Sequence, residues 1–529
     1  MLVRFRYDGG RFRGFPPRRP TELGEQTMSE YRTPWYRELN RYHWFVLVVA
    51  ALGWVFDCLD QQLFVLARPA AMIDLVPESQ TLVGEALKAA RSHAGAVATA
   101  VFLAGWATGG VFFGMLGDRI GRAKTMLITI LLYSAFTGLS SLSVGVWDFS
   151  LYRFLTGLGV GGEFAVGVAL VAEVMPHRAR PYALALLQAL SAIGNISAAL
   201  INMGLGLAEE QGLVSHPWRK MFLIGAAPAL LAVVIRFWLK EPERWEKASH
   251  DGAIGKKLGS YAQLFEDPKL RKHALLGLVL ACSGVIGLWG VGFFAPDLIR
   301  LVQTKSVTAK VYEEQRALAQ TNGDSELADA LAAVQAGAKL GEVPSASVTP
   351  EMLARVREKT DGIVSGRLAR WGSYTAILIN LGAFFGMFGF GAVSQRIGRR
   401  PTFAIGLLLA FVSTVSVFWF LKDFGQMWMV PVMGFCQLSL FAGYAIYFPE
   451  LFPTHLRSTG TSFCYNVGRF VAAVGPLVQS QLVSFFTELY QDSGREPLRY
   501  AGITMCSVFL LGLLVLPFLP ETKDQPLPE

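Results

Sequence analysis

Long apolar runs alternate with short polar and charged segments along almost the whole chain. The runs cover residues 44–67, 94–116, 125–144, 147–172, 182–205, 221–239, 273–296, 374–393, 402–421, 427–448, 460–486 and 501–519. Each run can cross about 30 Å of hydrocarbon as an α-helix, which needs roughly 18 residues or more. The pattern predicts an all-α integral membrane protein with twelve transmembrane helices.

The two halves of the chain repeat the same landmarks. The segment 114–124 returns as 391–400 and Glu173 with Arg180 returns as Glu450 with Arg457, both at an offset of 277 residues, while Pro242-Glu243 returns as Pro520-Glu521 at an offset of 278. Three landmarks at offsets of 277 or 278 residues indicate a duplicated membrane protein. We therefore expect two pseudo-symmetric six-helix bundles, at 44–239 and 273–519.

Composition and charge agree with a membrane protein. Only 17% of the 529 residues are charged, 52% are hydrophobic, and mean hydropathy is +0.39. The net charge of +8 comes from basic residues in the tail 1–43, the linker 240–272 and the loops on the same side. This is the positive-inside distribution, not a nucleic-acid surface. It predicts an inner-membrane protein with both termini, including the tail 520–529, in the cytoplasm.

Two segments depart from the regular pattern. The tail 1–43 has no apolar core of a signal peptide and is expected to be disordered. The segment 297–371 is much longer than its counterpart in the first half, and by parity it lies outside the membrane as a cap or lid. Its Glu/Ala/Arg pattern and the Thr349-Pro350 start signal predict short helices there.

Several kinds of chemistry are absent from the sequence. The five cysteines lie in apolar stretches without CxxC spacing, which predicts free, buried thiols. The chain has no Walker A lysine motif, no HExxH and no Ser-His-Asp set. We therefore expect neither an enzyme nor a protein with a cofactor or metal.

The segment that begins at Gly114 carries the most specific motif. Gly105 and Gly109, and Gly110 and Gly114, are small residues four apart, which let helices approach closely in lipid. Asp118 follows at a helix end, where a carboxylate can cap the N-terminus of a neighbouring helix. The motif therefore predicts a breakable latch between the halves. Its residues are Gly114, Asp118, Arg119, Gly121, Arg122, Glu173 and Arg180 in the first half and Gln395, Arg396, Gly398, Arg399, Glu450 and Arg457 in the second.

The motif G-x-L-x-D-R-x-G-R, with its degenerate repeat, resembles the signature of the major facilitator superfamily over about residues 44–523. The segment 153–163 is similar to the fourth-span motif of metabolite–proton symporters, and 447–469 to the aromatic-acid and sialic-acid branches. The resemblance implies the major facilitator fold and alternating access. Gln395 replaces the acid of the second copy, so the C-terminal latch is expected to be weaker. The segment 297–371 is longer than the family pattern.

Ionisable groups inside the spans suggest proton coupling, because a charge in hydrocarbon costs at least about 2.5–3.5 kcal/mol. Asp57 and Asp60 are three apart and share one face of the first span. Arg153 is expected at the depth of Asp57, so the two are expected to pair, and the resemblance puts proton coupling on the first-span acid. A permanent structural ion pair is the alternative. For Glu163, coupling and a structural hydrogen bond are both open.

Arg469 lies about ten residues into its span and suggests an anionic substrate. A buried guanidinium suits two-point recognition of a carboxylate, and the neighbouring spans are almost free of acids. Pairing with backbone carbonyls or with an acid of the other half is the alternative. Further candidates for the substrate cavity, or for bonds between helices, are Asn466, Tyr465, Gln437, Tyr444, Trp289, Gln188 and Asn195.

These observations predict a secondary transporter. We expect it to move a small organic acid or sugar-acid together with protons, as a monomer in the lipid bilayer without a nucleic-acid partner. A neutral sugar or polyol in the same fold is the first alternative. A membrane sensor that binds solute without flux is the second, and the absence of a signalling domain in the linker disfavours it.

Overall fold

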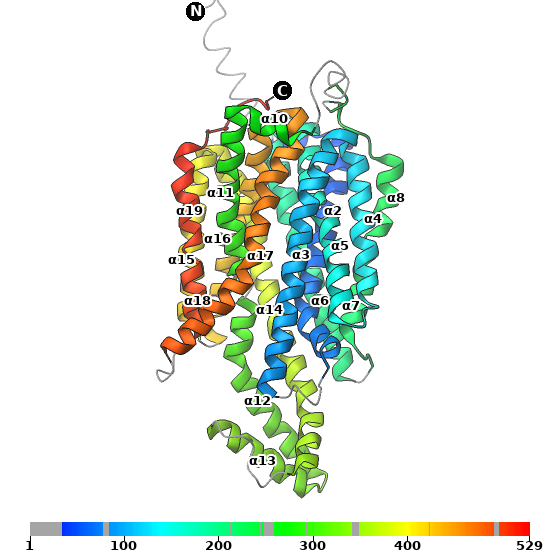
Figure 1. Cartoon of the computed structure of the whole chain (residues 1–529), viewed down its shortest axis with the longest axis vertical. Helices are drawn as coiled ribbons and strands as arrows, with labels where there is room; N and C mark the ends of the chain where they lie inside the picture. The colour runs from blue at the N-terminus through cyan, green and yellow to red at the C-terminus, as the bar shows by residue number, and fades with distance from the viewer. Residues whose placement is uncertain are drawn as a thin grey trace, which may run out of the picture.

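In the computed structural model, residues 34–77, 84–211, 213–243, 245–247, 259–291, 295–340, 349–422, 424–490 and 497–528 are described. Every regular element among them is a helix, and most run nearly parallel to one axis (Figure 1). The predicted disorder of the tail 1–43 falls mostly outside the described residues, which begin just before the short helix η1 (Trp35–Glu38).

The first half forms one bundle. Its helices are α2 (Arg41–Leu75), α3 (Gly84–Ile120), α4 (Arg122–Ser140), α5 (Val146–Val174), α6 (Arg180–Glu210), α7 (Pro217–Gly225) and α8 (Ala229–Trp238). The sixth apolar run is divided between α7 and α8, because Pro228 has no N–H to continue the helix.

The second half forms the other bundle. After α10 (Tyr261–Glu266), its helices are α11 (Pro268–Gly290), α12 (Ala295–Thr321), α13 (Ser325–Leu340), α14 (Pro350–Ile397), α15 (Arg399–Phe420), α16 (Met429–Leu451), α17 (Arg457–Leu489), α18 (Pro497–Met505) and α19 (Val508–Val515). Three short 3-10 turns, η3 (Phe424–Gln426), η4 (Thr454–Leu456) and η5 (Leu516–Phe518), lie between or after them.

Among the described residues, each of the twelve predicted apolar runs lies mostly in helices. In the described part of the chain, ten helical segments are long and apolar enough by themselves to cross a membrane. The other two runs are the divided α7–α8 and α17, whose 33 residues include the polar turn at 457–462.

The two bundles meet along two helix pairs, α3 against α17 and α6 against α14. Figure 1 shows α3 and α17 side by side at the centre of the molecule, with α10 and the C-terminal segment at one end and α13 at the other. We call the first of these the latch end. We call the second, which consists of α12, α13 and the first part of α14, the hairpin end. The described parts of the segment 297–371 thus lie at the opposite end of the molecule from the C-terminal segment.

Glycines let the helices at the centre of the molecule approach closely. A Cβ added at Gly105 or Gly109 would lie 2.2 or 1.9 Å from a carbonyl oxygen of α5. One added at Gly110 or Gly114 would lie 2.2 or 2.4 Å from a side-chain carbon of α17. The close packing predicted from the glycine spacing is therefore confirmed, and it serves two different partner helices.

The hairpin end has a small apolar core of its own. Leu331 and Val356, both fully buried, pack with neighbours from α12 and α13 in a cluster separate from the main core. The helix start at Thr349 is confirmed, since its hydroxyl accepts a hydrogen bond from the Met352 amide at 3.3 Å. Of the predicted short helices only α13, with 16 residues, is short, because α12 and α14 have 27 and 48 residues and continue the bundle outward.

Candidate functional site

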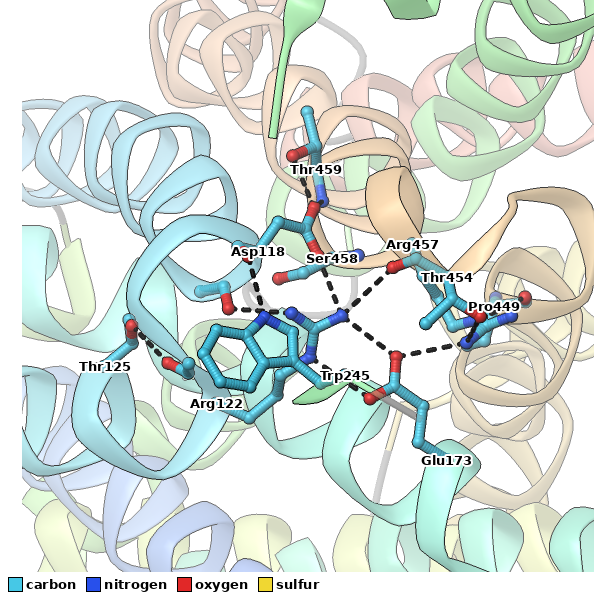
Figure 2. Close-up of polar contacts among 12 residues, drawn as sticks. Asp118, Arg122, Thr125, Glu173, Trp245, Pro449, Thr454, Arg457, Ser458 and Thr459 are labelled. Atoms are coloured by element: carbon cyan, nitrogen blue, oxygen red, sulfur yellow. Dashed lines mark hydrogen bonds and ion pairs between the residues drawn. The ribbon is translucent and has the colours of Figure 1, made fainter. Parts of the chain in front are cut away.

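The latch end holds a buried network of charges around Arg122 (Figure 2). Arg122 Nη2 lies 2.9 Å from an oxygen of Asp118 and 2.9 Å from Glu173 Oε1, while its Nε donates to Glu173 Oε2 at 3.2 Å. The same Nη2 also donates to the carbonyl oxygen of Thr454, in the second half, at 3.1 Å. Because all three charged side chains are fully buried, each depends on the others for its stability.

Asp118 caps a helix of the opposite half. Its carboxylate accepts hydrogen bonds from the backbone amides of Ser458 and Thr459 at 3.3 and 2.8 Å, and from the Thr459 hydroxyl at 2.6 Å. These groups belong to the first turn of α17, where unpaired N–H groups and the helix dipole favour an anion. The predicted cap is confirmed, and it joins α3 to α17 across the interface of the halves.

Glu173 makes a second link across the interface. Its Oε1 lies 3.0 Å from Nη1 of Arg457, which in turn donates to the Thr454 hydroxyl at 3.0 Å. Arg457 Nη2 reaches the carbonyl oxygen of Pro528 at 2.8 Å. The C-terminal segment therefore packs directly over the latch.

The second copy repeats the pairing within one half. Arg399 Nη2 lies 2.9 Å from Glu450 Oε1 and its Nε donates to Oε2 at 3.2 Å, which reproduces the geometry of Arg122 with Glu173. The Thr522 hydroxyl donates to the same Glu450 at 2.6 Å. The repeat identified from sequence is thus a repeat of structure.

Gly121 and Gly398 begin the following helices with φ of 113° and 100°, which favours glycine. Neither has room for a Cβ, which would lie 2.3 Å from Glu241 or 2.7 Å from Glu521. Each carboxylate accepts N–H bonds from the first turn of α4 or α15. The structural counterpart of Glu521 is therefore Glu241 and not the exposed Glu243 of the Pro-Glu echo.

The pKa of Glu521 lies below its ordinary value. Partial burial raises the pKa, but hydrogen bonds from the amides of Arg399, Arg400 and Lys523 outweigh it by stabilising the carboxylate.

The other predicted latch residues lie outside the buried network around Arg122. Arg119 and Arg396 are exposed, Gln395 is half-buried and Arg180 is buried. The exposed arginines are suited to anionic headgroups, as expected of cations at a helix end.

Arg153 pairs with Asp60 and not with Asp57. Arg153 Nη1 lies 3.5 Å from Asp60 Oδ1, which also accepts a hydrogen bond from Thr137 at 2.6 Å. Arg153 further donates to Ser140 Oγ at 2.7 Å. The predicted contact with Asp57 is wrong, because the lateral position of Asp60 on α2 brings it toward α4 and α5.

Asp57 and Glu163 have unused hydrogen-bond capacity inside the protein. Neither carboxylate oxygen of Asp57 has a partner among the described residues, although the side chain is fully buried. Glu163 accepts one bond from Thr129 at 3.1 Å and leaves its other oxygen unpaired.

Arg469 crosses the interface and is held between two aromatic rings. Its Cζ lies 3.9 Å from the ring centre of Trp106 on α3 and 4.1 Å from that of Tyr465 on its own helix. Nη1 donates to Asn466 Oδ1 at 2.7 Å and to the Tyr465 carbonyl at 2.9 Å. Its buried Nε has no hydrogen-bond partner among the described residues. Arg469 thus pairs in part with a backbone carbonyl, as the alternative held. Its Nε–H can still donate a hydrogen bond to a ligand.

Most of the other described candidates join helices to one another. Gln437 donates to the Gly287 carbonyl at 2.9 Å and Tyr444 to the Leu280 carbonyl at 3.0 Å, so both join α16 to α11. Asn195 joins the halves through Asn380 at 2.7 Å. Gln188 is buried with an unpaired carbonyl oxygen. The side chain of Trp289 lies outside the described residues.

Sequence reasoning missed two residues of these sites. Trp106 lies in an ordinary apolar run, where nothing marks it as the partner of a cation. Glu241 had a usable signal, since it is an acid directly after the sixth span in a basic linker, as Glu521 is an acid directly after the twelfth.

Comparison with known proteins agrees with this architecture. A family model described as Major Facilitator Superfamily matches residues 46–310 and 363–529. Its unmatched interval lies within the hairpin end. The proton:xylose symporter XylE bound to 6-bromo-6-deoxy-D-glucose has the same fold, with a TM-score of 0.64 and 16% identity over 92% of this chain and 98% of that one.

Curated relatives span most of the chain. A putative metabolite transport protein of Haemophilus influenzae is 27% identical and covers 93% of this chain and 99% of its own length. The sialic acid transporter NanX of Escherichia coli is 25% identical over 86% of this chain and 91% of its own length. The cis,cis-muconate transport protein of Acinetobacter baylyi is 26% identical over 72% and 76%.

Proposed function

The chain belongs to the major facilitator superfamily of membrane transporters, and on that premise we propose that it carries a small organic acid across the inner membrane in symport with protons. The observation that supports this best is that two buried groups of opposite charge, one from each half, have unpaired polar atoms. Asp57 comes from the first half and Arg469 from the second, both are fully buried, and both retain unused hydrogen-bond capacity. Water, a proton and a substrate carboxylate would meet that capacity.

In the proposal Asp57 is the principal proton carrier. A buried carboxylate without hydrogen bonds favours protonation, and the cation of Arg469 opposes it. A substrate carboxylate that neutralises Arg469 would therefore make protonation of Asp57 easier. Glu163 and the Asp60–Arg153 pair set the surrounding charge. The binding of the proton and the binding of the substrate are therefore coupled through the charge of Arg469.

The latch supports alternating access. The cap on α17 by Asp118 and the Glu173–Arg457 pair close the latch end, and a pathway there opens only when both break. The positive-inside distribution assigns the latch end to the cytoplasm. With this orientation the latch is closed toward the cytoplasm, and we propose that both termini lie inside and the hairpin end outside.

The substrate class follows from Arg469. A guanidinium forms two parallel hydrogen bonds with a carboxylate, and the flanking rings of Trp106 and Tyr465 suit an apolar or unsaturated body. Two of the relatives are named as transporters of carboxylic acids, one of cis,cis-muconate and one of sialic acid. The likeness to the xylose symporter concerns the fold alone, so it gives no support to a neutral sugar.

A flux assay with purified protein in liposomes tests the proposal. The panel contains labelled muconate, sialic acid and gentisate, with xylose as a neutral comparison and the amide of each transported acid as a matched one. We expect an acid to accumulate under an inward proton gradient, a protonophore to abolish that accumulation, and the amide to remain outside. Equal transport of acid and amide would contradict the role of Arg469.

The Asp57→Asn variant tests coupling separately. It should lose accumulation against a gradient but retain exchange of labelled for unlabelled substrate, since the substrate site is intact. Cys58→Ala, the neighbouring change without a charge, should retain both. Full proton-driven accumulation by Asp57→Asn would exclude Asp57 as the carrier.

A further inference from the structure

The face of α17 that packs against the first half carries a row of polar side chains. The members of the row share one side of the helix, because they follow one another at intervals of three or four residues, and they are Thr459, Ser462, Asn466 and Arg469. All four are buried. The row begins at the latch, where Thr459 binds Asp118 (Figure 2), and ends about 15 Å along the helix axis at Arg469. It therefore joins the latch to the group that the proposed function assigns to the substrate.

Asn466 lies in the middle of the row and binds three groups. Its Oδ1 accepts a hydrogen bond from Arg469 Nη1 at 2.7 Å. Its Nδ2 donates to the Gly161 carbonyl of α5, in the first half, at 3.3 Å and to Ser462 Oγ at 3.0 Å. The Ser462 hydroxyl in turn donates to the Gly110 carbonyl of α3. Two contacts across the interface of the halves therefore fix the side chain that holds Arg469.

The partners of Asn466 determine the direction of its amide. A guanidinium can only donate and a backbone carbonyl can only accept, so Oδ1 must face Arg469 and Nδ2 must face Gly161. Both N–H groups of Asn466 are then in use. Arg469, in contrast, keeps a buried Nε without a hydrogen-bond partner among the described residues. Asn466 is thus placed to orient the guanidinium, and the guanidinium is placed to bind the ligand.

These contacts depend on direct packing of α17 against the first half. A Cβ added at Gly110 would lie 2.2 Å from Asn466 Cγ, and one added at Gly161 would lie 2.0 Å from the Trp106 carbonyl oxygen. The two glycines therefore bring the backbones of α3 and α5 within reach of one asparagine. If the start of α17 moves away from α3 when the latch opens, the bonds to Gly161 and Gly110 are lost, because groups about 3.6 Å apart no longer form a hydrogen bond.

The corresponding helix of the first half, α6, has alanines in place of the row. At the 277-residue offset of the repeat, the counterparts of its last three members are Ala185, Ala189 and Ala192, and all three are buried. The packing has the same register, because a Cβ added at Gly391 would lie 2.5 Å from the Ala185 Cβ, and one added at Gly114 would lie 2.4 Å from that of Ser462. Alanines thus suffice for close packing here, and the polar side chains of α17 serve another purpose.

Resting on the proposed function, we propose that Asn466 is a positioning residue through which the latch controls the affinity of Arg469 for a substrate carboxylate. With the latch closed, the bonds to Gly161 and Ser462 hold the amide of Asn466, and the amide holds the guanidinium in one orientation. With the latch open, the amide loses its contacts with the first half, and the guanidinium loses its orientation. The acid is then bound more weakly and leaves through the open latch end.

The test measures affinity by competition binding on the purified full chain, with muconate, sialic acid, gentisate and the amide of each acid as probes. Asn466→Ala removes the bonds to Arg469 and Gly161. Ser462→Ala is a smaller change that removes the link to Gly110 and leaves the bond between Asn466 and Arg469. The control is Asn202→Ala, which removes a different hydrogen bond between the halves, to Ser373 at 3.0 Å. Each variant is also combined with Asp118→Asn, which opens the latch.

Asn466→Ala should weaken acid binding by about tenfold, the effect of one hydrogen bond to a charged group, and amide binding by less than about twofold. Ser462→Ala should weaken acid binding by about threefold, and Asn202→Ala by less than about twofold. Asp118→Asn should weaken acid binding by up to about tenfold in the wild type and in Asn202→Ala, but by less than about twofold in Asn466→Ala. This loss of additivity distinguishes positioning from a structural role, for which the two effects would add.

Unchanged acid affinity in a folded Asn466→Ala protein, equal losses for acid and amide, or effects that add to those of Asp118→Asn would each overturn the proposal. Binding of none of the three acids by the wild type would instead refute the proposed function. The link between Asn466 and the latch is then decided without ligand, by hydrogen exchange of the Ser458 and Thr459 amides. Their exchange should accelerate by about tenfold in Asn466→Ala and by less than about twofold in Asn202→Ala, and equal exchange in the two variants would overturn the link.

Discussion

Replacing Asp118 by asparagine removes one charge from the latch while keeping the shape of the side chain. In the wild type one carboxylate oxygen lies 2.9 Å from Arg122, and the two oxygens together accept three hydrogen bonds from Ser458 and Thr459. Asparagine retains one oxygen as an acceptor. The NH₂ group of asparagine takes the place of the other carboxylate oxygen. Because it is a donor that faces N–H or O–H donors, at least one hydrogen bond is lost.

The expected cost follows from these contacts. A hydrogen bond to a charged group contributes about 1.5–3 kcal/mol, and the loss of the Arg122 partner adds to this, although Glu173 still pairs with Arg122. We expect the closed latch to lose about 2–4 kcal/mol relative to a state in which Asp118 is hydrated. At 1.4 kcal/mol for each factor of ten, this shifts the population toward the open latch by roughly 30-fold to several hundred-fold.

Hydrogen exchange reports the shift directly. The Ser458 and Thr459 amides are bonded to Asp118, so their exchange in a peptide covering the start of α17 should accelerate by a similar factor. Thr459→Ala, which removes only the hydroxyl at 2.6 Å, should give a smaller acceleration. Gln395→Asn is the matched control, because the second copy has no acid at this position, and it should leave exchange at α17 unchanged.

Unchanged exchange in a folded Asp118→Asn protein would refute the reasoning. The cap would then contribute to helix geometry but not to the equilibrium between conformations.

Three further predictions concern other parts of the molecule. Arg469→Lys keeps the charge but loses the planar fork, so the affinity for a transported acid should fall by tens-fold while affinity for its amide is little changed, as measured by competition binding. Gly398→Ala places a Cβ in a conformation suited to glycine, which should cost about 1–3 kcal/mol and lower the apparent Tm; an unaltered Tm would contradict this. Because the folded pKa of Glu521 is lowered, its contribution to stability is complete above its ordinary pKa of about 4.3 and is lost as pH falls through the folded value. Glu521→Gln should therefore be less stable than the wild type at pH 7, and thermal unfolding should show the difference shrinking below about pH 4; a constant difference at all pH values would exclude this origin.

The sequence by itself determined the membrane-spanning pattern, the duplication and the chemistry of the latch. These properties depend on local spacing, which survives folding. Arg122 and Glu173 in one half and Arg399 and Glu450 in the other have the same separation, and the structure gives them the same bidentate geometry. The glycine spacing likewise predicted that the helices approach closely. A glycine has no Cβ to hold a neighbouring helix away, and this property belongs to the residue itself.

Only the tertiary structure decided which distant side chains meet. Asp57 and Asp60 are separated by three residues, about 4.5 Å along a helix axis and less than a full turn, and the depth argument from sequence favoured Asp57 as the partner of Arg153. The rotation of α2 about its axis places Asp60, and not Asp57, beside Arg153, and Asp57 has no hydrogen-bond partner among the described residues. Likewise the two rings that hold Arg469 come from α3 and α17, one from each half. Helix rotation and the packing of one bundle against the other fix these contacts, and neither leaves a periodic signal in the sequence.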